Sequence, residues 1–142
     1  MPKVHSVLPF EAVEGWTAIP NTIMNIYTLH PKFNANTVLV YMFLLKNFNR
    51  EYGYAYPTYD EIEITLNISR GTVANALQVL QELNLITAQK HPYYGNNVYV
   101  INPLIETVDE FIKKYPETEL IKRRNEEVRQ RLNTRKEAFK ST

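Results

Sequence analysis

Apolar residues occupy nearly every side of a helical projection between residues 36 and 49. A helix of this kind is normally enclosed by its neighbours, so we expect it at the centre of a core, capped by Asn34 or Asn36. The prolines at positions 2, 9, 20 and 31 exclude long helices ahead of it. Before this helix, residues 16–19 can form a short strand, and Asn21 can cap one or two helical turns.

Two helices separated by a tight turn are predicted next. Thr58 and Glu61 form a capping box, which opens a short helix that ends near Leu66. Asn67 tolerates the left-handed conformation that ends many helices. Ser69 then caps a longer helix, whose apolar face is formed at helical spacing by Val73, Ala76, Leu77, Leu80 and Leu83.

Strand-forming side chains in residues 85–90 and 98–101 flank a loop rich in Pro, Gly and Asn, which predicts a β-hairpin with a long tip. Asn102 and Pro103 suit the cap and first position of another helix, expected to run to Tyr115. Its apolar face either packs back on the body or forms a dimer interface. The charged segment 117–140 is predicted as a last helix with a thin apolar seam at Ile121, Val128, Leu132 and Phe139.

The elements predict a mainly α-helical fold with one small β-hairpin. We divide the chain into an N-terminal arm (1–33), a central domain (34–101) and a C-terminal helical extension (102–142). With 142 residues, of which 44% are hydrophobic and 22% charged, the chain has the size and composition of one soluble domain. No apolar run reaches the roughly 18 residues that a membrane-spanning helix needs, and residues 1–6 lack the apolar core of a signal peptide.

The residues that usually carry catalysis or bind metals are scarce. The chain has no cysteine, which excludes disulfides and thiolate chemistry and fits a reducing cytoplasm. His5, His30 and His91 are too scattered for a metal site, and the four glycines stand alone rather than in a phosphate-binding loop. We therefore expect neither a cofactor nor an enzyme.

The net charge of +1 hides an uneven distribution. Residues 1–100 carry six Lys and Arg against seven Asp and Glu, whereas residues 120–142 carry eight against three. The basic tail predicts contact with a polyanion, with a solvated helix surface as the alternative.

Residues 57–101 contain, in order, a short capped helix, a tight turn, a longer amphipathic helix and a hairpin. This is the plan of a winged helix-turn-helix, whose second helix enters the major groove of DNA. The segments 56–62, 66–73, 76–80 and 85–86 resemble the winged helix of phage and plasmid replication initiators and of DnaD-type primosomal N-terminal domains. The Ser-Arg-x-Thr-Val core at 69–73 is also similar to GntR-type transcription regulators.

The resemblance covers roughly residues 16–101 and implies sequence-specific binding of double-stranded DNA. Two positions depart from the usual pattern. Glu63 stands where a small residue lets the two helices touch, and Asn67 stands where glycine is usual.

Candidate DNA contacts fall into three groups. On the second helix, Ser69 and Thr72 can donate to phosphate, Arg70 suits phosphate or a guanine edge, and Asn75 and Gln78 suit an adenine edge. The hairpin tip offers side chains that can reach phosphates or the minor groove: Lys90, His91, Tyr93, Tyr94, Asn96 and Asn97. The last helix can add phosphate contacts through Lys122, Arg123, Arg124, Arg129 and Arg131.

Each group also has an interpretation that involves no DNA. Arg70 can pair with Asp60 or Glu82, Asn75 and Gln78 can be merely solvated, and Tyr93 and Tyr94 can pack on the body. For the remaining tyrosines, a packed aromatic patch is favoured over a platform that stacks single strands; they are Tyr52, Tyr54, Tyr56 and Tyr59.

The sequence thus predicts a cytoplasmic, homodimeric protein that binds double-stranded DNA and no membrane. Its expected role is replication initiation or origin binding in a phage or plasmid, with the replication or transcription machinery as partner. About 40 residues follow the hairpin, too few for an effector-binding domain, which disfavours a metabolite sensor. The alternatives are a transcriptional repressor and a winged helix whose exposed face binds another protein.

Overall fold

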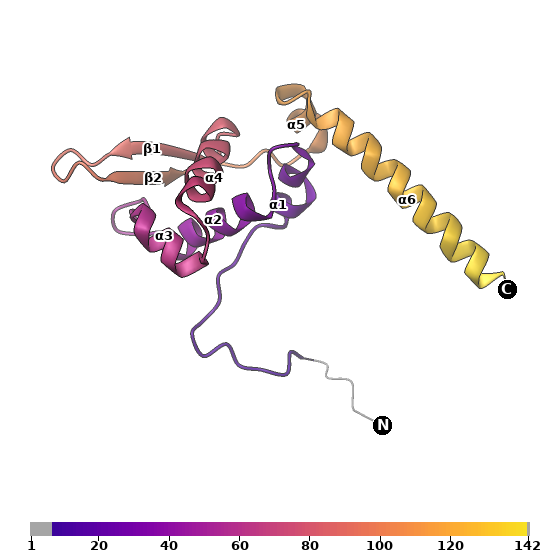
Figure 1. The fold of residues 1–142 in the computed structure, drawn as a ribbon, viewed down its shortest axis with the longest axis horizontal. Coiled ribbons are helices and arrows are strands. Elements are labelled where there is room, and N and C mark those ends of the chain that lie inside the picture. The colour runs from indigo at the N-terminus through magenta and orange to yellow at the C-terminus, as the bar shows by residue number, and fades with distance from the viewer. Residues whose placement is uncertain (1–6, 142) are drawn as a thin grey trace.

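The computed structural model describes residues 7–141 (Figure 1). The fold is mainly helical with one small antiparallel sheet of two strands, as the sequence predicts. In chain order its elements are α1 (Asn21–Asn25), the 3-10 helix η1 (Tyr27–Leu29), α2 (Ala35–Lys46), α3 (Tyr59–Leu66), α4 (Arg70–Glu82), β1 (Ile86–Lys90), β2 (Asn97–Ile101), α5 (Val108–Lys114) and α6 (Thr118–Lys140).

Polar side chains fix where the central helices begin. Of the two cap candidates for α2, Asn34 is the cap, and its side chain accepts from the Thr37 amide at 3.2 Å. The Thr58 hydroxyl accepts from the Glu61 amide at 3.1 Å and starts α3, and Ser69 starts α4 as expected. Each cap satisfies an amide that the first helical turn leaves without a partner, which contributes about 1 kcal/mol.

The core lies between α2 and α4. Val40, Tyr41 and Leu44 of α2 are at most 1% exposed, and α2 packs against α3 and α4. The five predicted apolar positions, from Val73 to Leu83 directly after α4, are all buried. Burial of such a side chain contributes roughly 1.5–3 kcal/mol, so these helices are held in place mainly by tertiary packing.

The hairpin pairs Ile86 with Ile101 and Lys90 with Asn97, close to the predicted boundaries. A third segment joins its edge, because Ala55 and Tyr99 exchange backbone hydrogen bonds of 3.0 and 2.7 Å. The chain between α2 and α3 is therefore fixed beside β2.

The prediction of a helix that starts at Pro103 is wrong for the first half of that helix. Residues 102–107 form no regular secondary structure, and α5 begins only at Val108, where Thr107 accepts from the Glu110 amide. Asn102 is not a helix cap, because its side-chain amide donates to the Asn84 carbonyl at 3.1 Å and to the Thr87 hydroxyl at 3.0 Å. These bonds tie Asn102 to the end of α4 and to β1 as the chain leaves the sheet.

Of the two alternatives for the apolar face of residues 103–115, the structure shows packing on the body. Phe111 is fully buried, and its ring centroid lies 4.8 Å from that of Tyr27. The Tyr27 hydroxyl accepts from the Ile105 amide at 2.9 Å. This contact joins η1 to the segment before α5.

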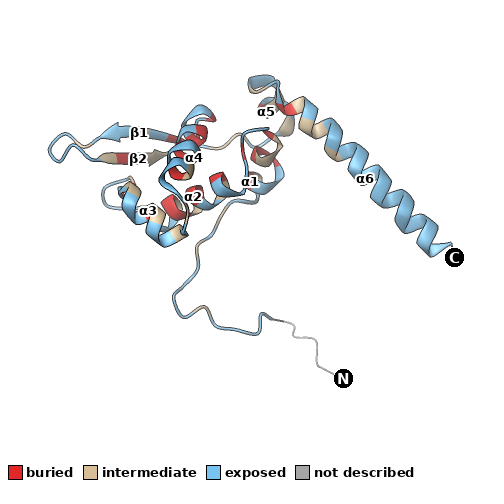
Figure 2. Cartoon of the chain, viewed as in Figure 1, coloured by how far each residue is buried: buried red, intermediate tan, exposed pale blue. Residues whose placement is uncertain are grey.

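Helix α6 leaves the body and runs alone, away from the hairpin (Figure 1). Thr118 is its only buried residue among those described, and the rest of its length is largely exposed (Figure 2). It is attached at its start, where Glu117 meets His30 of the loop after η1 at 2.8 Å. Since His30 Nδ1 accepts from the Lys32 amide, its ring proton lies on Nε2 and is donated to Glu117.

Three further sequence expectations need correction. Residues 16–19 are not a strand, because no other segment in residues 7–141 pairs with them. Asn21 does not cap α1 but is its first helical residue, behind Pro20. Helix α2 ends at Lys46 rather than Asn49, since Asn47 turns its side chain back to the Phe43 carbonyl at 2.9 Å. None of the helices in residues 7–141 combines the length and apolar character that crossing a bilayer requires.

Candidate functional site

The outer face of α4 is open to solvent. Arg70, Asn75 and Gln78 are all exposed, and the side chain of Arg70 has 64% of its surface accessible. Gln78 donates to Glu82 one turn later, at 3.2 Å. No other described segment covers the three polar side chains, so α4 can contact an external partner along this face.

The first turn of α4 faces the first turn of α2 across a polar hollow of about 400 Å³. Ser69 and Thr72 both line this hollow, and their hydroxyl oxygens are 2.8 Å apart. The hollow is also lined by residues of α2 and its cap, namely Asn34, Asn36 and Thr37. Backbone amides near a helix start favour an anion, and hydroxyls can donate to one. The hollow therefore has donors of the type that phosphate accepts from.

Arg70 is held by carboxylates of α3. Its Nη1 lies 3.1 Å from Asp60 Oδ1 and 3.6 Å from Glu63 Oε2, and its guanidinium lies over the Tyr59 ring. The expected pairing with Asp60 is present, whereas Glu82 pairs instead with Lys32 at 3.3 Å. Asn67, with φ 54° and ψ 50°, makes the left-handed turn that brings Arg70 close to α3.

This ion pair also explains the unusual residue at position 63. The Glu63 side chain is 26% exposed and lies where a small residue would let two helices touch. A carboxylate at this contact loses part of its hydration, and Arg70 compensates it with an opposite charge. Glu63 and Arg70 thus act as a pair across the α3–α4 turn, a relation that the sequence alone did not reveal.

The hairpin tip is an ordered turn rather than a loose loop. His91 Nδ1 accepts from the amides of Tyr93 and Tyr94 at 3.1 and 3.2 Å. The His91 amide donates to the Asn96 carbonyl at 2.8 Å, and Gly95 takes a positive φ of 70° that closes the turn. Tyr93 and Tyr94 do not pack on the body, since they are 88% and 82% exposed. Lys90 and Asn96 are exposed, and Asn97 is partly exposed.

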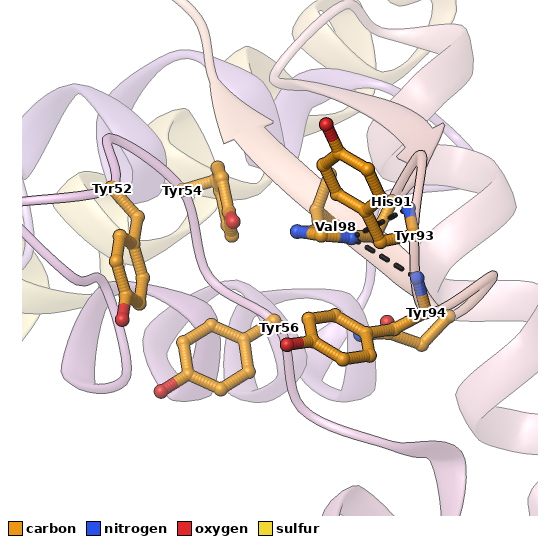
Figure 3. A pocket seen from close by; sticks show the side chains of 8 residues that line it. Tyr52, Tyr54, Tyr56, His91, Tyr93, Tyr94 and Val98 are labelled. Carbon is orange, nitrogen blue, oxygen red and sulfur yellow. Dashed lines mark hydrogen bonds between the residues drawn. The ribbon is translucent and has the colours of Figure 1, made fainter.

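A second aromatic group lies opposite this tip. The rings of Tyr52, Tyr54 and Tyr56 are 5.7–6.1 Å apart, centroid to centroid. Tyr59 belongs elsewhere, against Arg70. Together with the tip, these three tyrosines line an open groove of about 420 Å³ (Figure 3), whose walls are completed by His91, Tyr93, Tyr94, Asn96 and Val98.

The groove was not predicted from the sequence, although the sequence contains a signal for it. Tyrosine recurs at every second position from 52 to 56, and in an extended chain such positions share one face. What could not be seen is that Ala55 pairs with Tyr99, which brings that face beside the hairpin tip.

The structure does not bring the basic residues of α6 to the other candidate contacts. Arg123 and Arg124 are exposed near the attached end of α6, and Arg123 pairs with Glu119 at 3.5 Å. The hairpin tip lies at the opposite end of the molecule (Figure 1). The candidate contacts on α6 are therefore separate from those on the hairpin tip.

Within residues 7–141, no three side chains of the kinds that ligate metals gather in one place. His5 lies outside the described residues. Burial raises the pKa of Tyr41 to about 12, but this ring lies in the core rather than at either surface. Comparison with protein-family models, curated proteins and solved structures finds no match for the chain.

Proposed function

We propose that residues 34–101 form a winged helix-turn-helix that binds double-stranded DNA, with α4 in the major groove and the hairpin as the wing. The order of α3, a turn at Asn67, α4 and the hairpin supports this assignment. The proposal has no catalytic step and no cofactor.

One observation carries the proposal: the exposed face of α4 presents Arg70, Asn75 and Gln78 with no other described segment over them. The side-chain amides of Asn75 and Gln78 match the N6 and N7 edge of adenine, and a guanidinium matches the O6 and N7 edge of guanine. The hydroxyls and amides at the start of α4 suit the adjoining phosphates.

The proposed biological role rests on the resemblance of residues 56–86 to replication initiators. We infer replication initiation or origin binding in a phage or plasmid, in the cytoplasm, with transcriptional repression as the alternative role. Footprinting separates the two, because an initiator protects repeated sites inside an origin and a repressor protects a promoter.

A protein-binding winged helix is the second candidate function, and the charge of α4's surroundings favours it. Arg70 is neutralised by Asp60 and Glu63, and Lys32 is neutralised by Glu82. The face is consequently not basic, unlike most surfaces that attract phosphate. This candidate predicts no affinity for duplex DNA even at low salt, where phosphate attraction is strongest.

Selection of bound sequences from a random duplex library at low salt tests the main proposal. We expect enrichment of one motif, and Asn75→Ala or Gln78→Ala should weaken binding to it by about 1–3 kcal/mol each. The matched control is Gln130→Ala, which removes the same amide from exposed α6. A library that returns no enriched sequence contradicts specific recognition.

The role of α6 in DNA binding is tested by salt dependence. If Arg123 and Arg124 both contact phosphate, the double alanine variant should reduce the slope of log affinity against log salt by about 1.8. Titration of the selected duplex at several salt concentrations measures it, and an unchanged slope removes α6 from the interface.

A further inference from the structure

We propose that the tyrosine groove between residues 52–56 and the hairpin tip binds unpaired bases of single-stranded DNA by stacking. This proposal extends the proposed duplex binding to a strand that has separated from its complement. The groove shares the hairpin tip with the proposed wing, but its other wall is new, because Tyr52, Tyr54 and Tyr56 precede α3 and are not among the candidate duplex contacts.

The groove is a distinct feature on the side of the hairpin away from the core. Val98 is only 5% exposed, yet it lies outside the core cluster to which its neighbour Tyr99 belongs. Since successive strand residues point to opposite faces, Val98 points away from the core and into the groove that it lines. Around it, Tyr52 and Tyr56 expose 59% and 46% of their surface, and both tip tyrosines expose more than 80%.

Contacts between aromatic rings occur on both walls of the groove. Tyr52 and Tyr54 stack with an interplanar angle of 23° and a centroid distance of 5.7 Å. On the other wall, the His91 ring holds the backbone of Tyr93 and Tyr94 by two hydrogen bonds and lies 4.7 Å from the Tyr94 ring (Figure 3). Contacts between neighbouring rings, such as Tyr52 with Tyr54, reduce the side-chain freedom that is lost on binding, which favours affinity.

The chemistry of the lining selects a flat, uncharged group on an anionic chain. The lining consists of five tyrosines, His91, Asn96 and Val98, and it contains no carboxylate. Tyrosine faces stack on any base, and the Asn96 amide can bond to a base edge.

The flanking charges favour the phosphates of such a strand. Arg50 and Lys90 adjoin the two walls in sequence, with Lys90 at the end of β1 and on the opposite face of the hairpin from Val98, and neither forms an ion pair within residues 7–141. Glu51 is the one carboxylate in residues 49–57 and 90–98. A proline-rich peptide, which also favours aromatic grooves, has no need of these cations.

Base pairing decides between the two forms of DNA. In a duplex the base faces are covered by their neighbours, and only base edges are accessible in the grooves. Stacking on Tyr52 or Tyr94 therefore requires a base outside the duplex.

The test measures fluorescence anisotropy of the full chain with three labelled probes of equal length: a single strand, the same strand without bases, and a duplex. We expect the single strand to bind and the abasic strand to bind at least about tenfold more weakly, because phosphates alone cannot stack. Equal affinity for the two strands overturns the proposal.

Two paired variants locate the interaction. Changing Tyr52 and Tyr56 to leucine should weaken single-strand binding by about five- to 150-fold for each base that loses its stacking partner. Changing the same residues to phenylalanine keeps the ring faces and should keep the affinity. Equal affinity of the leucine and phenylalanine variants overturns the proposal; circular dichroism of each variant establishes that the fold is retained.

Failure here is distinguishable from failure of the duplex proposal. The Asn75→Ala, Gln78→Ala variant should lose specific duplex binding and keep single-strand binding, and the leucine variant should do the reverse. Duplex binding without single-strand binding overturns only the groove proposal, and single-strand binding without duplex binding overturns only the proposed function of α4. A proline-rich peptide that binds the groove when the single strand does not also overturns the stacking proposal.

Discussion

Helices α4 and α6 show two ways in which one chain forms a helix. Helix α4 buries five of its side chains, from Val73 to Leu80, against α2, α3 and the sheet. Helix α6 is longer, with 23 residues, yet among those described only Thr118 is buried. The first helix depends on tertiary packing, and the second depends on the propensity of its Glu, Lys, Arg and Gln residues and on charge pairs such as Lys122 with Glu126.

This difference separates two kinds of exposed residue. On α4, an exposed side chain is held in a fixed place by the buried face beneath it. On α6, most of the described side chains are exposed, so their positions relative to the core depend on the attachment near Glu117. A recognition surface is better built on the first kind, because binding geometry requires rigid support.

The largest effect on stability is expected from Leu77→Ala in α4, which tests whether this helix is held by its packing. This side chain is 1% exposed, so its truncation should leave a cavity and lower the free energy of unfolding by about 2–5 kcal/mol. Urea denaturation measures the change. A loss below about 1 kcal/mol would mean that α4 is not held by its packing.

A smaller effect is expected from the pair that links α3 to α4. Because Arg70 is 64% exposed, Arg70→Ala should cost only about 0.2–1 kcal/mol of stability. The same change in a Glu63→Ala background should cost less, since Arg70 then has no partly buried carboxylate to neutralise. A double-mutant cycle measures this coupling, and strictly additive losses would contradict the pairing.

The attachment of α6 should be sensitive to acid. A hydrogen bond from its own backbone amide, and then one from His30, lowers the pKa of Glu117 from its ordinary value of 4.5. A carboxylate whose pKa is lowered by folding stabilises the folded chain at pH values above its ordinary pKa. This stabilisation is lost as the pH falls through the lowered pKa. The unfolding midpoint of the wild-type chain should therefore fall more steeply between about pH 5 and pH 3 than that of Glu117→Gln. Parallel pH profiles would contradict a role for this carboxylate.

The smallest effect on folding is expected at Leu132, which is 47% exposed on α6. Leu132→Ala should change the stability of the monomer by no more than about 0.5 kcal/mol. The same residue belongs to the seam that predicts a homodimer, so the variant should shift the sedimentation mass at micromolar concentration from two chains towards one. A wild-type mass of one chain would contradict the dimer.

The central helices could be predicted from local signals because their caps and apolar spacing agree with their packing. Thr58 and Ser69 start α3 and α4 as expected, and Asn67 takes the expected left-handed conformation. The prediction of a helix cap at Asn102 was wrong because its side chain bonds to Asn84 and Thr87, and Thr87 lies in the first strand of the hairpin. A cap signal holds only when no more distant partner competes for the same side chain.

The sequence by itself determined that α3, the turn at Asn67, α4 and the hairpin form where they do, since their caps, turn residues and apolar spacing depend on neighbours within a few residues. It also determined the inventory of polar groups on α4. Tertiary structure alone decided that Arg70 neutralises Glu63 and that the apolar face of α5 is covered by the body. It also decided that tyrosines 40 residues apart share a groove, for instance Tyr54 and Tyr94. These relations join residues across the α3–α4 turn, between η1 and α5, and across the Ala55–Tyr99 bridge, and they arise only when the folded chain brings separate segments into contact.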